Sequence, residues 1–509
     1  MQLRSMVSRR AILSVSVVLS TLLSTLDSTI VNVALPHMQG SLQANQDQVA
    51  WVLTSYIVIT AITMPLTGWF GTRFGLRRVL SISVVGFTLG SIGCGFAANL
   101  GQMVFFRIFQ GALGASLVPL SQVALMQEYP RSEHPKVMAM WTMGVLVGPV
   151  LGPTLGGYLT DAFSWRWAFF INVPVGILAY LGILEGLDAG HTDHSRPFDW
   201  LGFILLSLAI GLLQMMLDRG HSLDWFSSPE ILAEAFFGAL CAYMFVVHAF
   251  TTKHPFVDPH LFRDRNYAVS LGLMFVSGMS IVMPSVLVPT FLQSLQGYSP
   301  MQAGSLQASR GVASIIAVVV AGRLVGRVGA RPVILAGVIA SGISLIMLAQ
   351  YTLDTPRMTI LLTTIFTGIA SPLIFVPLSV VGYLTLAPQQ RAEAGVMMTL
   401  IRNMGSSIGI SVAVTTLSRS TQLNTSYLAE HFSAYDFSRW HALGTAPGAN
   451  LTTAAIVGEI QRQAAVIAYS NVYYTLALAS LVVLPTVFVM RSRVKLGPTP
   501  TEVTDLASH

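Results

Sequence analysis

Long apolar stretches recur along this 509-residue chain, and they constrain its fold more than any other feature. Each is about 18–25 residues long, enough for one helix to cross the hydrocarbon core of a bilayer. A helix satisfies its own backbone polar groups in lipid, so we expect an all-α integral membrane protein. About fourteen spans are predicted, at residues 12–34, 50–70, 79–98, 101–126, 138–160, 167–186, 200–217, 230–250, 267–291, 302–324, 332–351, 358–384, 393–417 and 469–490.

The few charged residues follow a pattern that predicts the orientation of these spans. Only 10% of residues are charged, against about 25% in soluble proteins. Loops rich in Lys and Arg stay in the cytoplasm, so both termini are expected there. The basic residues are too dispersed to predict a nucleic-acid partner. The main basic clusters are Arg4, Arg9 and Arg10; Arg73, Arg77 and Arg78; Lys253, Arg263 and Arg265; and Arg491, Arg493 and Lys495.

An internal repeat divides the chain into related halves. The second span is followed by Gly68-Trp-Phe-Gly-Thr-Arg-Phe-Gly-Leu-Arg77, and the tenth by Gly322-Arg-Leu-Val-Gly-Arg-Val-Gly-Ala-Arg331. Two related halves with a substrate path between them are typical of transporters. The expected organisation is a six-helix bundle at 1–190, an extra helix pair at 198–252, a second six-helix bundle at 266–491 with a long outer loop at 418–468, and a disordered cytoplasmic tail at 497–509.

Six segments, in order along the chain, carry a resemblance to a known family. They are Leu26–Pro36, Gly68–Arg77, Phe106–Gly111, Gly144–Gly157, Trp165–Pro174 and Leu217–Ser228. In these segments the chain resembles the major facilitator superfamily, and within it the fourteen-helix drug:proton antiporters of the EmrB type. The resemblance implies the major facilitator fold. Thr72 departs from the pattern because most members have Asp there, so another acid or helix dipoles would have to replace that residue.

The resemblance also implies a function and partners. Members of this type export hydrophobic, structurally varied drugs and toxic compounds across the bacterial inner membrane, driven by protons. They work with a periplasmic membrane-fusion adaptor (EmrA-type) and an outer-membrane TolC-type channel, and the 418–468 loop is a candidate contact. No enzyme activity, cofactor or metal is expected. None of the three lysines follows the glycine frame of a phosphate-binding loop, so direct use of ATP is not expected.

Asp27 is the most conspicuous residue, because it is an ionisable side chain at the end of an uncharged run. A carboxylate in lipid needs a partner or a function. Counted from the cytoplasmic ends of their spans, Asp27 lies about 22 Å and Arg107 about 21 Å into the membrane. We therefore expect the two to pair, and protonation of Asp27 would release Arg107. The alternative is a static pair that only joins the first and fourth helices.

Other polar residues within the spans are candidates for the substrate pathway. They are Asn32, Arg310, Arg402 and Asn403. Intramembrane cations are functional candidates by default, although snorkelling or pairing with backbone carbonyls would also explain them.

Two further groups are candidates for moving parts. A cytoplasmic gate is predicted from the repeat, at Gly68, Arg73, Gly75, Arg77, Arg327 and Arg331; the alternative is that these arginines only set the topology. A flexible antiporter helix is predicted from Gly144, Gly148, Pro149, Gly152, Pro153 and Gly156; ordinary tight packing has the same signature.

Three other functions remain open at this point. The chain could be a dedicated proton-driven exporter of one metabolite, such as a siderophore or fatty acid. It could also be a membrane scaffold that transports nothing, or a proton-coupled importer. A scaffold leaves the intramembrane charges without a role, and the Gly144–Gly157 segment argues against an importer.

Overall fold

A computed structural model describes residues 2–44, 46–130, 133–188, 192, 197–220, 223–253, 255–387, 390–430 and 453–490. Within these residues every regular element is a helix. The N-terminal half comprises α1 (Gln2–Ser41), α2 (Gln46–Phe74), α3 (Leu76–Phe96), α4 (Leu100–Gly114), α5 (Leu117–Glu128), α6 (His134–Ala162), α7 (Trp167–Phe170) and α8 (Asn172–Gly186).

The chain then forms an intervening pair of helices and a C-terminal half. The pair is α9 (Trp200–Arg219) and α10 (Pro229–Thr251). A short 3-10 helix, η2 (Trp225–Ser227), lies between them, and another, η3 (Pro259–Arg263), follows α10. The C-terminal half comprises α11 (Arg265–Ser294), α12 (Pro300–Val328), α13 (Ala330–Ala349), α14 (Arg357–Leu384), α15 (Arg391–Glu430), α17 (Thr453–Val482) and α18 (Leu484–Val489).

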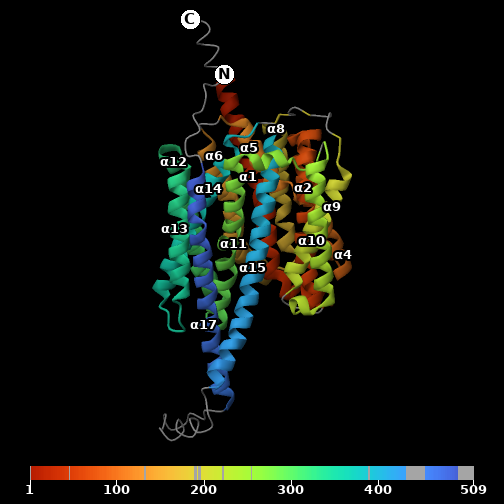
Figure 1. The fold of residues 1–509 in the computed structure, drawn as a ribbon. Helices are drawn as coiled ribbons and strands as arrows, with labels where there is room; N and C mark the ends of the chain where they lie inside the picture. Colours follow the sequence, from red (N-terminus) through yellow and green to blue (C-terminus); the bar gives the residue numbers. More distant parts are fainter. Residues whose placement is uncertain are drawn as a thin grey trace.

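A helix lies at each predicted membrane span. In the described part of the chain, twelve helical segments are long and apolar enough to cross a membrane, with α4 and α5 forming one of them. The other two predicted spans are occupied by α6 and α15, of 29 and 40 residues. The helices stand side by side in one bundle (Figure 1). We call the side where α1 begins and α18 ends the terminal face, and the side where α15 ends and α17 begins the hairpin face.

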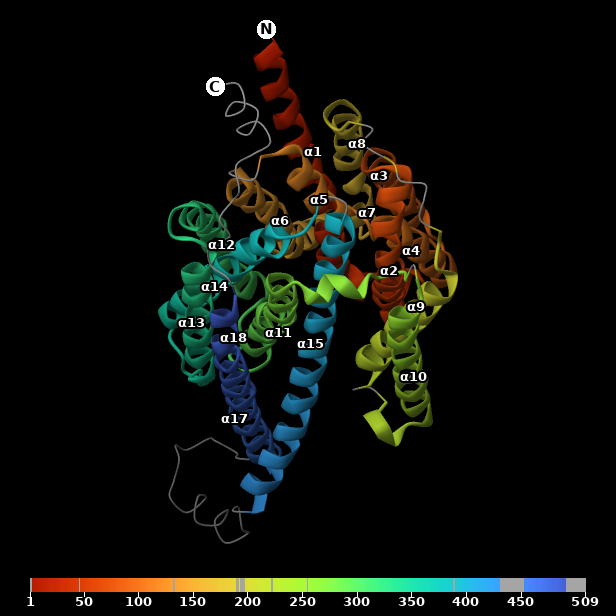
Figure 2. The same ribbon diagram turned by 45° about the horizontal axis from the view of Figure 1, so that its top comes forward.

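The α9–α10 pair lies along one side of the bundle, where α9 contacts both halves (Figure 2). It packs on α2 of the N-terminal half. Toward α15 of the C-terminal half, the Gln214 amide donates to Ser407 Oγ at 2.9 Å, and Ser411 Oγ donates to the Leu217 carbonyl at 2.9 Å. The pair therefore bridges the halves through α9.

The repeated motif has the same backbone geometry in both halves. Gly75 separates α2 from α3 with φ of 84°, and Gly329 separates α12 from α13 with φ of 87°. This left-handed region favours glycine, which explains why both copies of the motif carry one there. The two halves thus turn between equivalent helices in the same way.

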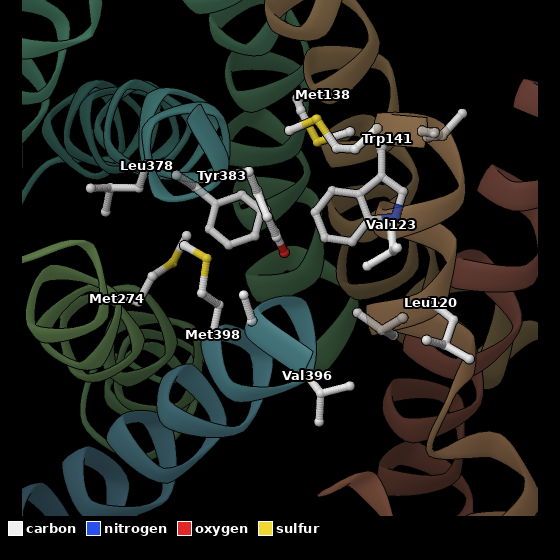
Figure 3. Packing of buried hydrophobic residues seen from close by; sticks show 14 of the residues in the cluster. Leu120, Val123, Met138, Trp141, Met274, Leu378, Tyr383, Val396 and Met398 are labelled. Atoms are coloured by element: carbon white, nitrogen blue, oxygen red, sulfur yellow. The ribbon is translucent and has the colours of Figure 1, made fainter. Parts of the chain in front are cut away.

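The buried apolar side chains form one cluster that is shared by both halves and two that are not. The shared cluster lies toward the terminal face and includes Val123, Trp141, Tyr383 and Met398 (Figure 3). Trp141 stacks on Phe375 across the halves, with ring centroids 5.8 Å apart. Toward the hairpin face, each half has its own cluster. The halves are therefore joined by a common core only on the terminal side of the described structure.

The predicted loop at 418–468 is wrong for most of its length. Helix α15 continues to Glu430 and α17 already begins at Thr453; residues 431–452 lie outside the described residues. The two helices pack against each other, and the Asn424 amide donates to the Ala464 carbonyl at 3.4 Å. This pairing, rather than lipid, supports the helices there. At 40 residues, α15 is about 60 Å long, roughly twice a bilayer core, and it projects beyond the bundle (Figure 1). The predicted tail at 497–509 also lies outside the described residues.

Candidate functional site

The structure brings Asp27 of α1 and Arg107 of α4 together. Arg107 Nη1 lies 2.6 Å from Asp27 Oδ2, and neither side chain has any exposed surface. The sequence estimate that placed both residues at a similar depth is thus consistent with their contact. Such a pair avoids the cost of an isolated charge in a low-dielectric interior.

Two amide side chains complete the surroundings of the Asp27 carboxylate. Gln110 Nε2 donates to Asp27 Oδ1 at 2.9 Å, and Asn172 Nδ2 donates to the same oxygen at 3.0 Å. The carboxylate therefore accepts three hydrogen bonds, from α4 and α8. These donors join α1 to α4 and α8 through the Asp27 side chain.

Arg107 is held as firmly as its partner. Its Nε donates to the Val52 carbonyl of α2 at 3.0 Å, and its Nη1 donates also to Gln110 Oε1 at 2.8 Å. The guanidinium lies 4.0 Å from the centre of the Tyr56 ring, a favourable cation–π contact. One charged network therefore ties α1, α2, α4 and α8 together.

Two buried polar atoms at this site have no hydrogen-bond partner among the described residues, Arg107 Nη2 and Asn172 Oδ1. A protonated Asp27 would become a donor and would need an acceptor. Asn172 Oδ1 is an acceptor available beside the carboxylate, on a side chain that already contacts it.

Gln110 and Asn172 were not among the residues singled out in the sequence. Both were nevertheless inside segments that carried the family resemblance, Phe106–Gly111 and Trp165–Pro174. A polar amide within an otherwise apolar span was the available signal.

The glycines of α6 form the surface on which α1 packs. A Cβ atom added at Gly144 would lie 2.7 Å from Val18, and added at Gly148 or Gly152 it would overlap Thr25 or Thr29. At Gly156 the contact is less close, and an added Cβ would lie 3.2 Å from the Ile30 carbonyl oxygen. Thr29 Oγ1 donates to the Gly148 carbonyl at 3.2 Å. The helix that carries Asp27 is therefore in backbone-level contact with α6 over several turns.

The two prolines of this segment do not share that surface. Pro149 is exposed, and the side chain of Pro153 lies outside the described residues. Helix α6 continues through both positions.

The remaining polar candidates lie away from Asp27. Arg310 of α12 is half-buried and its Nη1 donates to Ser285 Oγ of α11 at 2.6 Å. Arg402 of α15 is half-buried, donates to Asn403 Oδ1 at 3.2 Å and lies 5.3 Å from the Phe375 ring centre. Asn32 is exposed, and its amide donates to the Ser28 carbonyl of its own helix at 3.2 Å.

The predicted gate residues make contacts with helix ends and aromatic rings. Arg77 Nη2 donates to the Leu184 carbonyl in the last turn of α8 at 2.6 Å, which is the helix-terminus arrangement. Arg73 lies over Trp69 at 5.6 Å and Arg331 over Phe488 at 4.6 Å, whereas Arg327 is exposed. Gly68 is buried.

Thr72 stands where most members of the resembled family have Asp, and it contacts only its own helix among the hydrogen bonds described. Its hydroxyl donates to the Trp69 carbonyl of its own helix at 2.9 Å.

Comparison with known proteins assigns the chain to a family. The Major Facilitator Superfamily matches residues 17–257 and 269–499. The chain belongs to this superfamily. Relatives include the multidrug export protein EmrB of Escherichia coli K12, 32% identical over 481 residues (93% of this chain and 94% of EmrB), and the fatty acid resistance protein FarB of Neisseria gonorrhoeae, 34% identical over 428 residues (83% of each).

Solved structures of membrane transporters show the same fold. The proton:xylose symporter XylE superposes with a TM-score of 0.57 at 15% identity, covering 92% of this chain and 95% of XylE. The human organic anion transporter MFSD10 gives a TM-score of 0.58 at 14% identity, covering 93% of this chain and 98% of MFSD10. The superfamily member described here is therefore an all-α, multi-span membrane transporter and not an enzyme, as predicted.

Proposed function

We propose that this chain is a proton-driven antiporter that exports hydrophobic, structurally varied toxic compounds across the bacterial inner membrane. The observation that carries the proposal is the fully buried Asp27, which is paired with Arg107 and lies on the helix packed against the glycine face of α6. Similarity to the multidrug export protein EmrB supports export.

The positions of the basic residues support the assignment of the terminal face to the cytoplasmic side of the membrane. Arg9, Arg10, Arg73 and Arg77 all belong to this side of the bundle, and the positive-inside rule assigns such a side to the cytoplasm. The hairpin face is then periplasmic. A core shared by both halves on the cytoplasmic side, with separate cores on the periplasmic side, is the arrangement of an outward-facing transporter.

The proton would act through the charge of Asp27. Protonation removes the attraction to Arg107, and α1 is then free to shift against α6, where glycines allow the backbones to slide closely. Asp27 has no exposed surface in this conformation, so a proton reaches it only when α1, α4 or α8 moves. Proton binding and rearrangement of the halves are thereby coupled.

Proton-gradient-driven dye efflux in inverted membrane vesicles tests this proposal. Asp27→Asn keeps the size of the side chain but cannot change charge, so gradient-dependent transport is expected to fall to the level of vesicles lacking the protein. Asp188→Asn is the matched control, because Asp188 pairs with Arg9 at the surface at 2.5 Å. Equal transport by the native and Asp27→Asn chains would make the ion pair a static link between α1 and α4.

We also propose that the α15–α17 hairpin binds the periplasmic adaptor of a tripartite efflux system that continues to an outer-membrane channel. The hairpin projects beyond the other helices of the bundle (Figure 1), and α15 is 40 residues long. It presents apolar side chains at Leu423, Tyr427 and Val457, which are 58%, 61% and 46% exposed.

A split between cellular and vesicle assays tests this second step. Leu423→Ser with Tyr427→Ser is expected to abolish drug resistance in cells while leaving transport in vesicles unchanged, because only the cellular assay requires the adaptor. Asp354→Asn, exposed on a neighbouring loop of the same face, is the control. Loss of both activities, or of neither, would contradict an adaptor site on the hairpin.

The similarity to the fatty acid resistance protein FarB favours a second candidate, a dedicated exporter of one amphipathic metabolite. Competition among chemically diverse compounds for the same vesicle transport separates the two. Mutual competition supports broad export, and transport of a single compound class supports the dedicated exporter.

A further inference from the structure

Charge is distributed unevenly between the membrane spans of the two halves. From residue 266 to residue 430, the acidic residues are Asp354, Glu393 and Glu430. Asp354 is in a loop, and the two glutamates are near the ends of α15. Arg310 and Arg402, by contrast, lie roughly 15 Å along α12 and α15, near the middle of a ~30 Å core. The middle of the C-terminal half therefore carries positive charge and no carboxylate.

Arg402 is a positive charge without a carboxylate partner in the described part of the chain. Across the residues that the structure describes, Arg402 forms no ion pair. Its neighbours are the neutral Asn403 side chain at 3.2 Å and the face of Phe375 at 5.3 Å. The nearest acid on its own helix, Glu393, accepts the Asp258 backbone N–H at 2.6 Å instead. A guanidinium held within the membrane without a carboxylate has lost much of its hydration and has gained no counter-charge.

The position of Arg402 places it where the two halves separate. Leu400, two residues before Arg402, belongs to the shared core, and so do Phe375 and Trp141. Trp141 in turn donates to Thr21 Oγ1 of α1 at 3.0 Å. The stacked pair Trp141–Phe375 closes the contact between the halves on one side of Arg402, and the separate cores of the two halves lie on the other. Arg402 is thus at the base of the region between the halves.

We propose that Arg402 binds the anionic head group of the exported compound and that the substrates are lipophilic organic anions. This inference rests on the proposed export function and names its substrate class. A guanidinium binds a carboxylate with two parallel hydrogen bonds, and a half-buried one does so with little competing water. Asn403 adds a neutral donor beside it. The Phe375 ring, whose centre lies 5.3 Å from the guanidinium carbon, limits the site on one side.

The two halves would then have different tasks. Asp27 in the N-terminal half binds the proton, and Arg402 in the C-terminal half binds the anion. Inward movement of one proton together with outward movement of one monovalent anion transfers two positive charges inward. A membrane potential that is negative inside the cell therefore drives such an exchange more strongly than the exchange of a proton for a neutral compound.

The test compares a carboxylate with its uncharged ester. Purified full-length chain in detergent is titrated with a fluorescent long-chain fatty acid and with its methyl ester, and both probes are also followed in inverted vesicles. Arg402→Gln is expected to weaken binding of the acid by at least about tenfold, the effect of losing a charge-assisted contact, and to leave binding of the ester unchanged. Arg402→Lys keeps the charge and is expected to retain part of the affinity.

Arg419→Gln is the matched control, because Arg419 is on the same helix and is exposed. Equal weakening of acid and ester in Arg402→Gln would indicate a structural role, and unchanged binding of both would overturn the site. Failure of the native chain to bind the acid would also overturn it. Binding to the purified chain without proton-driven transport in vesicles would retain the anion site and contradict the antiport proposal, so the two failures are distinguishable.

Discussion

The two halves of this transporter share a repeat but treat buried charge in opposite ways. In the N-terminal half, Arg107 is fully buried and meets a carboxylate, one side-chain amide, a backbone carbonyl and an aromatic ring. In the C-terminal half, Arg402 is half-buried and meets a neutral amide and an aromatic ring. The first arrangement is complete within the protein, whereas the second has room for a negative charge from elsewhere.

This difference is informative because the backbone of the two halves is so similar. The turns at Gly75 and Gly329 have almost the same φ, and the superfamily model matches segments of both halves. The two arginines nevertheless lie on different helices of the repeat, because Arg107 is on α4, the counterpart of α14, and Arg402 is on α15, the counterpart of α6. In the proposed function, the half that contains its own counter-charge binds the proton, and the half that lacks one binds the substrate.

The largest effect is expected when the internal counter-charge of the N-terminal half is removed. Arg107→Met leaves the Asp27 carboxylate buried without its cation, which costs about 3–5 kcal/mol of folding free energy. The double variant Asp27→Asn with Arg107→Met is expected to recover most of that stability but no proton-driven transport. Thermal unfolding in detergent, followed by vesicle transport, measures the two quantities. A single variant as stable as the native chain would show that the pair is not a buried unit.

A smaller effect is expected from filling the contact between α1 and α6. Gly152→Ala places a Cβ in the space of Thr29, and overpacking of this kind costs about 1–3 kcal/mol. Transport is expected to fall with it, because α1 can no longer approach α6. Gly157→Ala is a control within the same segment, since nothing lies within 4 Å of an added Cβ there. Equal transport by both variants would show that close packing at α6 is not needed for movement.

The sequence predicted the Asp27–Arg107 contact better than its surroundings, for a physical reason. The rise per residue of a helix is fixed, so the depth of a side chain follows from its distance to the helix end. Which face of the helix points inward does not follow as directly, and Gln110 and Asn172 were not identified as partners of Asp27. The repeat was more informative, because the same motif led to the same positive-φ glycine in both halves.

The error at 418–468 has a different origin. A prediction based on apolar length detects only the part of a helix that lipid stabilises. Helices α15 and α17 continue past that point because they stabilise each other, as the contact between Asn424 and Ala464 illustrates. Apolar length in the sequence also predicted spans at α6 and α15. In the described chain, twelve other helical segments are long and apolar enough to cross a membrane.

The repeated gate motif offers a comparison at the scale of about 1 kcal/mol. Arg77 in the N-terminal half donates to the Leu184 carbonyl at the end of α8, whereas Arg331 in the C-terminal half lies on the Phe488 ring. Arg77→Gln is expected to cost about 1 kcal/mol, because both groups are half-exposed and the hydrogen bond is charge-assisted. Arg331→Gln is expected to cost about 0.5 kcal/mol, the value of an exposed cation–π contact. Unfolding midpoints of the two variants decide the order, and a larger loss for Arg331→Gln would reverse this ranking of the halves.

The smallest effect on stability is expected at the residue proposed to matter most for the substrate. Arg402→Met removes a charge that has no ionic partner among the described residues, so the free energy of unfolding is expected to change by less than about 1 kcal/mol or to rise. The same substitution at Arg107 is expected to cost several times as much, because Arg107 is fully buried against a carboxylate. Parallel thermal unfolding of Arg107→Met and Arg402→Met in one detergent measures the difference. If Arg402→Met destabilised the chain as much as Arg107→Met, Arg402 would have to be held by the protein itself, and the C-terminal half would then have no charge left over for an anion.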